Sequence, residues 1–146
     1  MSINIRPLAT ADRTAWLALW QGYLDFYETS VPQEVTDETW RRIIDPDGPI
    51  HGLCAVDVDS RLVGIVHYLF HPVTWSIGPR CYLEDLFVTP DARGSGAGRA
   101  LIEAVYRAAD AVGADQVYWL TADSNATARK LYDSVGRLTP FMKYRR

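Results

Sequence analysis

The chain has 146 residues, of which 48% are hydrophobic and 23% are charged, so length and composition predict a single domain, residues 1–146, with one core. Its net charge of −3 gives no basic face for general nucleic-acid binding, and no nucleic-acid partner is expected. No apolar run approaches the roughly 20 residues that cross a membrane, and the start lacks a signal-peptide core, so a cytoplasmic protein without a membrane partner is expected.

The two cysteines, Cys54 and Cys81, both lie in apolar runs of strand-like composition. Two cysteines do not make a disulfide framework, and no histidine or cysteine stands at metal-ligand spacing from either one. We therefore expect buried free thiols, a reducing compartment and no metal.

The first half of the chain predicts one strand, two helices and a hairpin. Residues 3–6 alternate and end at Pro7, as a first strand would. Helical spacing follows, and it places five apolar residues on one face: Trp16, Leu19, Trp20, Tyr23 and Tyr27. A second, shorter helix opens at Thr36. Two apolar runs, residues 53–58 and 62–70, are separated by a turn and predict a hairpin of buried strands.

The second half predicts a strand, a glycine turn, a long helix and a final crossover. Residues 82–88 form the fourth strand, and the helix after the turn covers residues 99–112. This helix is expected to bury four apolar residues: Leu101, Val105, Ala108 and Val112. Residues 116–121 predict a fifth strand, residues 125–136 a further amphipathic helix, and residues 138–144 a last strand.

The predicted element order is therefore β α α β β β α β α β. A helical pair comes early, an antiparallel meander lies in the middle, and a strand–helix–strand crossover comes late. This order predicts an α/β fold, a mixed sheet with helices on both faces, and the chain contains no internal repeat.

The stretch from residue 82 to 105 joins a strand to a helix through the turn Arg93-Gly94-Ser95-Gly96-Ala97-Gly98. A helix that starts directly after such a turn leaves its first backbone N–H groups without internal partners, and its dipole is positive at that end. Because glycine has no side chain to hold a ligand away from the backbone, the turn predicts an anion site. A tight turn that needs glycine only for its own geometry is the alternative.

Three nucleotide-binding patterns can be compared with this turn. The dinucleotide fingerprint G-x-G-x-x-G fails because Arg99 stands where its third glycine belongs, and a P-loop fails because no Gly-Lys-Ser/Thr is present. The third pattern, R-x-x-G-x-G, fits at Arg93, Gly96 and Gly98. One crossover later, the pattern N-x-x-A-x-x-x-Y fits at Asn125, Ala128 and Tyr132.

These motifs, at their places in the strand and helix order, resemble the GNAT superfamily of acyl-CoA N-acyltransferases over most of the chain. In that family the backbone amides of the turn hold the pyrophosphate of coenzyme A, so the resemblance implies acetyl-CoA as co-substrate. It assigns cofactor contacts to the turn and to the second motif: Arg93, Gly94, Ser95, Gly96, Ala97, Gly98, Arg99 and Asn125. An N-cap role is also open to Asn125, and the two roles can coexist.

The resemblance further implies that the fourth strand splays from the fifth at a bulge. Free N–H groups of the splayed strand would receive the thioester carbonyl and pantetheine at Leu86, Phe87 and Val88. It also implies that Tyr132 is the acid for the leaving thiolate, because the matching family position carries a Tyr beside the sulfur. A core aromatic is the alternative for Tyr132, since Ala128, Leu131 and Val135 share its helical face.

Glu84 is predicted as the general base, acting through a water. A carboxylate in an apolar strand is costly unless it is paired or hydrated, so both Glu84 and Asp85 require a reason. The run LEDLFV resembles the LEDFFV-type strand of diamine acetyltransferases, whose Glu sits in the acceptor site, and this favours Glu84. Solvation of both carboxylates at a splayed edge is the alternative. Strand alternation predicts Tyr82, Glu84, Leu86 and Val88 on one face, and on the other Leu83, Asp85 and Phe87.

Acidic and aromatic residues gather near the end of the first helix, at Asp25, Phe26, Tyr27 and Glu28, with Glu34 beyond. Such a mixture suits an ammonium group through ion pairing and cation–π contact. Tyr27, Glu28 and Glu84 are therefore the predicted acceptor-binding residues, and a helix end with solvated carboxylates is the alternative. His67 and His71 are open to a second-base role or to a structural one.

Together these features predict an acetyl-CoA-dependent N-acetyltransferase that acts directly on the primary amine of a small molecule such as a polyamine or an amino acid. A protein Lys or N-terminal acetyltransferase is one alternative, and a catalytically silent acyl-CoA-binding module is another. The family implies a homodimer. The sequence departs from the family after the Tyr132 helix, where Arg137 follows Gly136 although the family often has Gly-Phe. Because the final strand often shapes the acceptor site or a dimer contact in the family, the sequence leaves both undetermined.

Overall fold

Five strands form one mixed sheet in the order β1-β2-β3-β4-β5. The computed structural model describes residues 2–146. The strands are β1 (Asn4–Pro7), β2 (His51–Val56), β3 (Leu62–His71), β4 (Arg80–Val88) and β5 (Val117–Tyr118). The helices are α1 (Arg13–Phe26), α2 (Gln33–Ile44), α3 (Ala97–Ala111) and α4 (Ala126–Val135), with single 3-10 turns η1 (Thr10–Asp12) and η2 (Pro90–Ala92).

The strand pairing follows from the connections. β1 to β4 pair antiparallel with their neighbours, whereas β4 and β5 are parallel because α3 returns the chain across the sheet between them. The predicted α/β order is confirmed from the first strand to α4.

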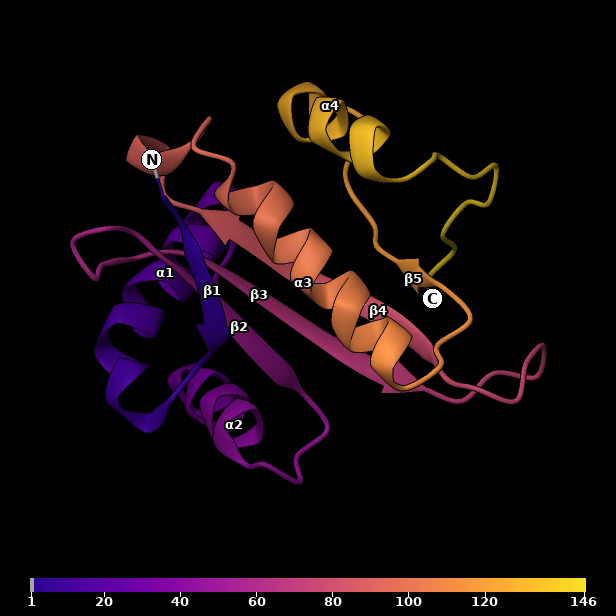
Figure 1. Cartoon of the computed structure of the whole chain (residues 1–146), viewed down its shortest axis with the longest axis horizontal. Coiled ribbons are helices and arrows are strands. Elements are labelled where there is room, and N and C mark those ends of the chain that lie inside the picture. Colours follow the sequence, from indigo (N-terminus) through magenta and orange to yellow (C-terminus); the bar gives the residue numbers. More distant parts are fainter. Residues whose placement is uncertain (1) are drawn as a thin grey trace.

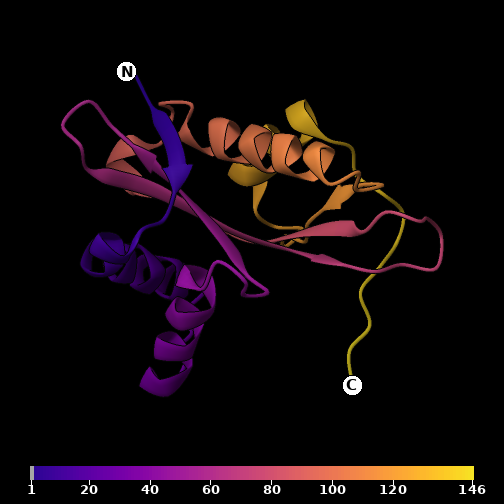
Figure 2. The same cartoon turned by 60° about the horizontal axis from the view of Figure 1, so that its bottom comes forward.

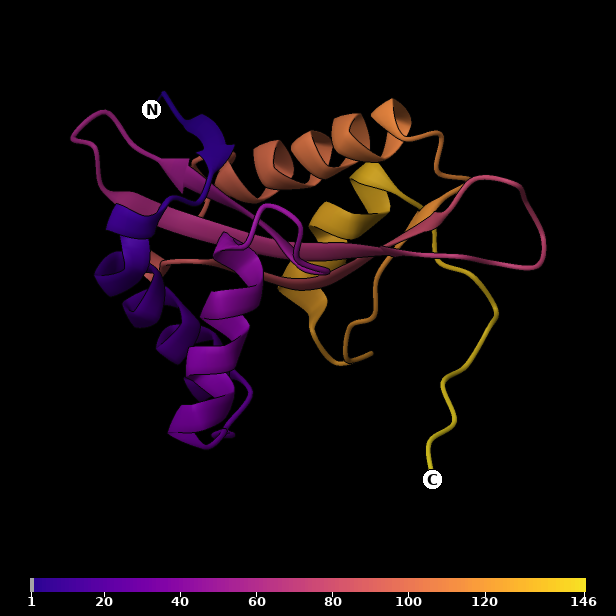
Figure 3. The same cartoon turned by 90° about the horizontal axis from the view of Figure 1, so that it is seen from below.

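Helices cover both faces of the sheet, as predicted. α1 and α2 lie on one face, and α3 lies on the other with α4 beside it (Figures 1 and 3). The spacing of its apolar residues explains the orientation of α1, because its buried side chains recur every three or four residues: Trp16, Leu19, Trp20 and Leu24.

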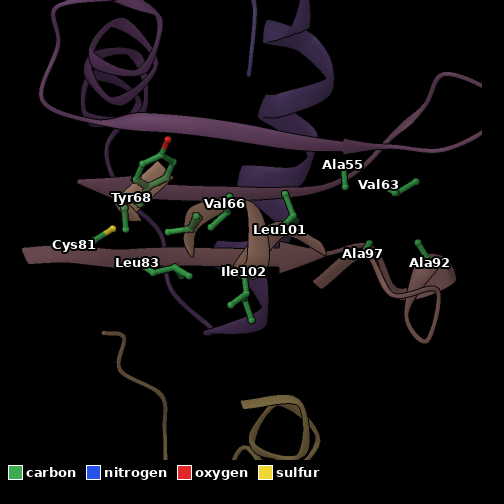
Figure 4. Packing of buried hydrophobic residues seen from close by; sticks show 12 residues of the cluster. Ala55, Val63, Val66, Tyr68, Cys81, Leu83, Ala92, Ala97, Leu101 and Ile102 are labelled. Atoms are coloured by element: carbon green, nitrogen blue, oxygen red, sulfur yellow. The ribbon is translucent and has the colours of Figure 1, made fainter. Parts of the chain in front are cut away.

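Two hydrophobic clusters fill the spaces on either side of the sheet. The cluster under α3 combines Leu101 and Ile102 of the helix with Val66 of β3 and Leu83 of β4 (Figure 4). The cluster under α1 and α2 is rich in aromatic residues and includes Trp16, Trp20, Trp40 and Phe87. Cys54 and Cys81 are buried free thiols, as expected.

A β-bulge in β4 changes which way its side chains point. His67 of β3 pairs with Asp85 but the next residue pairs with Leu83, so Glu84 has no partner in the register. The predicted strict alternation is therefore wrong. Leu83, Leu86 and Val88 pack with the α3 cluster, while Phe87 packs with the α1 cluster and Asp85 meets His67 on the same side.

The predicted last strand, residues 138–144, does not form. The chain leaves α4 at Gly136 and runs as an extended tail on the side of the sheet where α1 and α2 lie (Figures 2 and 3). A strand needs a hydrogen-bonding neighbour, and β5 is only two residues long. Pro140 also removes one backbone donor from the segment.

One buried position was also predicted wrongly. Val112 follows the last residue of α3 and is 50% exposed, because the helix has ended and its face no longer reaches the sheet. Leu101 and Val105 are buried as predicted, and Ala108 is half-buried. Within residues 2–146, no helix has both the length and the apolar character that a membrane crossing requires.

Candidate functional site

The glycine turn lies between the end of β4 and the start of α3. Gly94 and Gly96 have φ angles of +81° and +88°, a left-handed conformation that residues with side chains rarely adopt. A Cβ built at either position would meet no atom within 4 Å, so the turn opens outward. Gly98 serves a different purpose, since a Cβ there would lie 3.2 Å from the side chain of Leu131 in α4.

Unpaired backbone donors line this turn. Among residues 2–146 no acceptor is found for four of its N–H groups, those of Gly94, Gly96, Gly98 and Arg99. Ser95 accepts a weak bond from the N–H of Ala97, at 3.4 Å, through its hydroxyl. Free donors at the positive end of a 15-residue helix, with open space in front of them, fit a pyrophosphate.

The edge of β4 continues this row of donors. β4 and β5 pair only at Cys81 and Tyr82, so from residue 83 to 88 that edge has no strand beside it within the described chain. Leu86, Phe87 and Val88 lie on this open stretch.

The two arginines of the turn contact protein groups. The guanidinium of Arg93 lies 5.9 Å from the ring centres of Phe26 and Phe87, and its Nε donates to the carbonyl of Val88 at 3.3 Å. Arg99 donates to Ser134 Oγ at 2.6 Å, which ties α3 to α4. Arg93 therefore links the turn to the end of α1.

Helix α4 carries the two motif residues Asn125 and Tyr132. Asn125 is the N-cap residue, yet its side chain makes no capping bond and instead donates to Thr121 Oγ1 at 3.4 Å. Tyr132 packs edge-on against Trp119, with ring centres 5.5 Å apart. Burial raises the pKa of Tyr132 to about 12, and the charge of Tyr27 adds to the increase.

The end of α1 and the bulge in β4 bring acidic and aromatic groups together. Burial raises the pKa of both Tyr23 and Tyr27, and the charge of Asp85 raises each one further. Glu84 is exposed as a residue, but partial burial of its carboxyl raises its pKa, and the adjacent Asp85 adds to that increase. Glu84, Asp85 and the two tyrosines thus form one electrostatic unit, which we call the acceptor wall.

Glu28 lies outside this unit. It is exposed, has a φ of +53°, and lines a shallow depression in the α1–α2 connection together with Asp25, Thr29 and Ser30. Glu28 therefore lies in the exposed α1–α2 connection, whereas Tyr27 follows the last residue of α1 and Glu84 lies at the bulge in β4. Glu34, also exposed, lies in the first turn of α2.

Asp85 of the wall is bonded to His67, which is bonded to Trp16, and these three did not enter the sequence prediction as a group. Trp16 donates its indole N–H to His67 Nε2, and His67 Nδ1 lies 2.9 Å from Asp85 Oδ2. The signal that could have found them is a histidine in an apolar strand and an aspartate in the next, but pairing them requires the register of the sheet.

His71 is engaged elsewhere. Its Nδ1 faces the carbonyl of Pro72 at 2.9 Å, so that nitrogen carries the proton, and its Nε2 accepts from the hydroxyl of Tyr118 at 2.8 Å. Tyr118 in turn stacks on Tyr82 with ring centres 4.8 Å apart. No group of three or more His, Cys, Asp or Glu side chains suited to a metal occurs in residues 2–146.

Comparisons with known proteins agree with this geometry. The family model of the acetyltransferase (GNAT) family matches residues 16–136. A D-amino-acid N-acetyltransferase of Saccharomyces cerevisiae is 39% identical over 145 residues, which are 99% of this chain and 90% of the relative. A thialysine N-epsilon-acetyltransferase of Bos taurus is 37% identical over 75 residues, covering 51% of this chain and 44% of the relative.

Solved structures support the fold. The aminoglycoside acetyltransferase AAC(6')-Iy, in complex with a bisubstrate analogue, superposes with a TM-score of 0.84 at 20% identity, covering 100% of this chain and 99% of that one. Family model, near full-length relative and fold lead to the same conclusion. The chain is an N-acetyltransferase that belongs to the GNAT acetyltransferase family.

Proposed function

We propose that this enzyme transfers an acetyl group from acetyl-CoA to the primary amine of a small molecule such as a polyamine or an amino acid. The observation that carries the proposal is a juxtaposition: the open donor row of the glycine turn and β4 ends beside a wall of two carboxylates and two tyrosines. The near full-length relative that acetylates D-amino acids supports a small acceptor.

Each part of the site has a role in this proposal. The free N–H groups of the turn hold the pyrophosphate, and the open β4 edge at Leu86 to Val88 binds pantetheine and the thioester carbonyl. Acetyl-CoA supplies an activated acyl group, the thioester. Asn125, at the start of α4, contacts the same co-substrate.

Two side chains move protons. Glu84, whose pKa is raised, accepts a proton from the acceptor's ammonium through a water, which frees the nitrogen lone pair. As the new C–N bond forms and the C–S bond breaks, the hydroxyl of Tyr132 donates its proton to the departing thiolate. Because its pKa is raised to about 12, Tyr132 holds that proton throughout the neutral range.

The acceptor wall favours acceptors with a second positive charge. Asp85 raises the pKa of both Tyr23 and Tyr27 through its charge, and two further acidic residues, Asp25 and Glu28, line the depression at the end of α1. An ammonium group beside such carboxylates and rings gains ion pairing and cation–π attraction.

Release of free CoA across matched amines tests the proposal. Cadaverine against pentylamine and D-lysine against D-norleucine differ by one ammonium group at similar length, so we expect the member of each pair with two ammonium groups to have the higher kcat/KM. Turnover only on Lys peptides or protein N-termini would favour the protein-acetyltransferase alternative. Tight CoA binding without turnover on any amine would favour the silent module.

We also propose that the chain forms a homodimer. The tail carries four apolar side chains with exposed fractions of 75–93%: Leu138, Phe141, Met142 and Tyr144. Trp75 and Ile77, in the β3–β4 connection, are also exposed. Sedimentation equilibrium should show a dimer that Phe141→Asp dissociates, whereas Val58→Asp, at an exposed residue of the β2–β3 turn, leaves it intact. A monomeric wild-type chain would contradict this proposal.

A further inference from the structure

A row of three side chains connects the interior of the α1 layer to the bulge in β4. The indole N–H of Trp16 donates to His67 Nε2 at 3.0 Å, and His67 Nδ1 lies 2.9 Å from Asp85 Oδ2. Exposure increases along the row, from 0% for Trp16 and 1% for His67 to 15% for the side chain of Asp85. The row therefore begins in the core and ends at the acceptor wall.

The chemistry of the donors determines the protonation of His67. An indole N–H can donate a hydrogen bond and cannot accept one, so His67 Nε2 must be the acceptor and carries no proton. The single ring proton is then on Nδ1, from which it is donated to Asp85. Adding a second proton would set two N–H groups face to face at a buried position, which is costly. This bonding also removes His67 as a base toward substrate, because its lone pair is occupied.

The groups around the row are few and can be named. Glu84 lies beside Asp85 on β4, and the charge of Asp85 raises the pKa of Tyr23 in α1 and of its C-cap residue Tyr27. β2 presents Gly52 to the His67 ring, so it adds no charge there. From α2, the ring of Trp40 packs 4.9 Å from that of Trp16, and from α1 the ring of Trp20 lies 5.6 Å from that of His67. Asp85 is thus the acidic end of a polarised row, whereas no hydrogen-bond partner of this kind holds Glu84 within the described residues.

We propose that Trp16 and His67 are positioning residues that hold the Asp85 carboxylate in one orientation, so that Asp85 binds the acceptor's ammonium while its neighbour Glu84 takes the proton. The inference rests on the proposed function. It explains why two adjacent carboxylates occur at the bulge: Asp85 is held by a fixed donor and binds the ammonium, and Glu84, which has no such donor among the described residues, takes the proton.

Trp16→Phe and Trp20→Phe form a matched pair for the test. Trp20 lies one turn further along α1, is buried, and stacks on Trp16 with ring centres 6.0 Å apart, but its N–H donates to Thr36 Oγ1. Each substitution keeps an aromatic ring and removes one buried N–H. We expect the KM for the amine to rise about 10-fold in Trp16→Phe alone, which corresponds to loss of one hydrogen bond next to a charge. The KM for acetyl-CoA should be unchanged in both.

Nitrogen-15 NMR of the His67 ring gives a readout independent of turnover. The wild type and Trp20→Phe should show a single neutral tautomer protonated on Nδ1 at about pH 7. Trp16→Phe should show a mixture of tautomers or an imidazolium. An unchanged spectrum in Trp16→Phe, or equal KM effects in the two variants, would overturn the proposal.

Asp85→Asn provides a variant at the exposed end of the row, where folding is least at risk. It removes the charge at nearly constant size, and we expect the amine KM to rise while the acetyl-CoA KM stays constant. In the Asp85→Asn background, Trp16→Phe should have little further effect, because both act through the same carboxylate. An unaltered amine KM in Asp85→Asn, or full additivity, contradicts the proposal. A wild-type enzyme without turnover would instead refute the proposed function. The NMR spectrum would then still show whether Trp16 fixes the tautomer of His67.

Discussion

The glycine turn and the acceptor wall both include parts of the segment that runs from β4 to α3, yet backbone groups form the turn and side chains form the wall. The turn presents unpaired backbone N–H groups to open space. Its two arginine side chains contact other parts of the protein: Arg99 bonds to Ser134 of α4, and Arg93 packs against Phe26 and Phe87. The wall consists of side chains from α1, its C-cap residue Tyr27 and β4, and His67 of β3 bonds to it. A site made of backbone is encoded locally, whereas a site made of side chains depends on how distant elements meet.

The largest expected effect is at the turn. Gly96→Glu places a side chain and a negative charge at a residue with φ of +88°, in the space assigned to the pyrophosphate. We expect CoA affinity to fall by about 100-fold or more, equivalent to about 2.7 kcal/mol. Calorimetric CoA titration is the measurement. Gly113→Glu is the control, since Gly113 also has positive φ (+70°) and open surroundings at the other end of α3. The free energy of unfolding should fall by about 1–2 kcal/mol in both variants, but CoA affinity should fall only in Gly96→Glu.

Glu84→Gln should distinguish the acceptor wall from the glycine turn, because it should lower the rate without lowering CoA affinity. The raised pKa of Glu84 means that the wild-type rate falls as the pH drops through that pKa, above the ordinary range of a glutamate, because the protonated carboxyl cannot act as base. We expect kcat to fall about 100-fold, in the usual range for loss of a general base, while CoA affinity is retained. The acid limb of the kcat/KM profile should disappear. Asp59→Asn, in the β2–β3 turn, should keep both the rate and the limb; unchanged kinetics in Glu84→Gln would remove Glu84 from the mechanism.

Tyr132→Phe should have a smaller effect on kcat, about 10-fold, because a thiolate is a fairly good leaving group even without an acid. Its pKa of about 12 predicts that the wild type shows no basic limb from this group near neutral pH. Steady-state rates at several pH values, with CoA titration alongside, are the measurement. Tyr68→Phe is the control, a buried tyrosine in the α3 cluster. Equal rates for wild type and Tyr132→Phe would leave Tyr132 as a packing residue.

The smallest effect concerns the residue that joins the two regions. Arg93 spans from the turn to Phe26 at the end of α1, so Arg93→Met should weaken both acetyl-CoA and amine binding. Each cation–π contact is worth about 0.5–1 kcal/mol, which predicts rises of about 2- to 5-fold in both KM values. Arg107→Met, on the exposed face of α3, should change neither. A change in the KM for acetyl-CoA alone would show that the glycine turn and the acceptor wall are independent.

Much of the architecture could be predicted from local pattern. The helical spacing from Trp16 to Tyr27, the apolar hairpin strands and the glycine turn each have a period or a residue type that determines their structure without distant partners. The tail could not be predicted in the same way. Leu138 to Tyr144 has the composition of a strand, but a strand exists only beside another strand, and β5 is too short to provide one.

The sequence by itself determined the order of elements from β1 to α4, the family motifs and the place of the glycine turn, because each depends on local pattern or on a few consecutive residues with fixed backbone requirements. Only the tertiary structure decided the faces of β4, since one unpaired residue at the bulge moved Leu86 and Val88 to the α3 side. The tertiary structure also decided which residues hydrogen-bond in a row with Asp85. His67 and Trp16 lie 18 and 51 residues apart from their respective partners in this row, and only the register of β3 against β4 and the packing of α1 on the sheet bring them within hydrogen-bond distance.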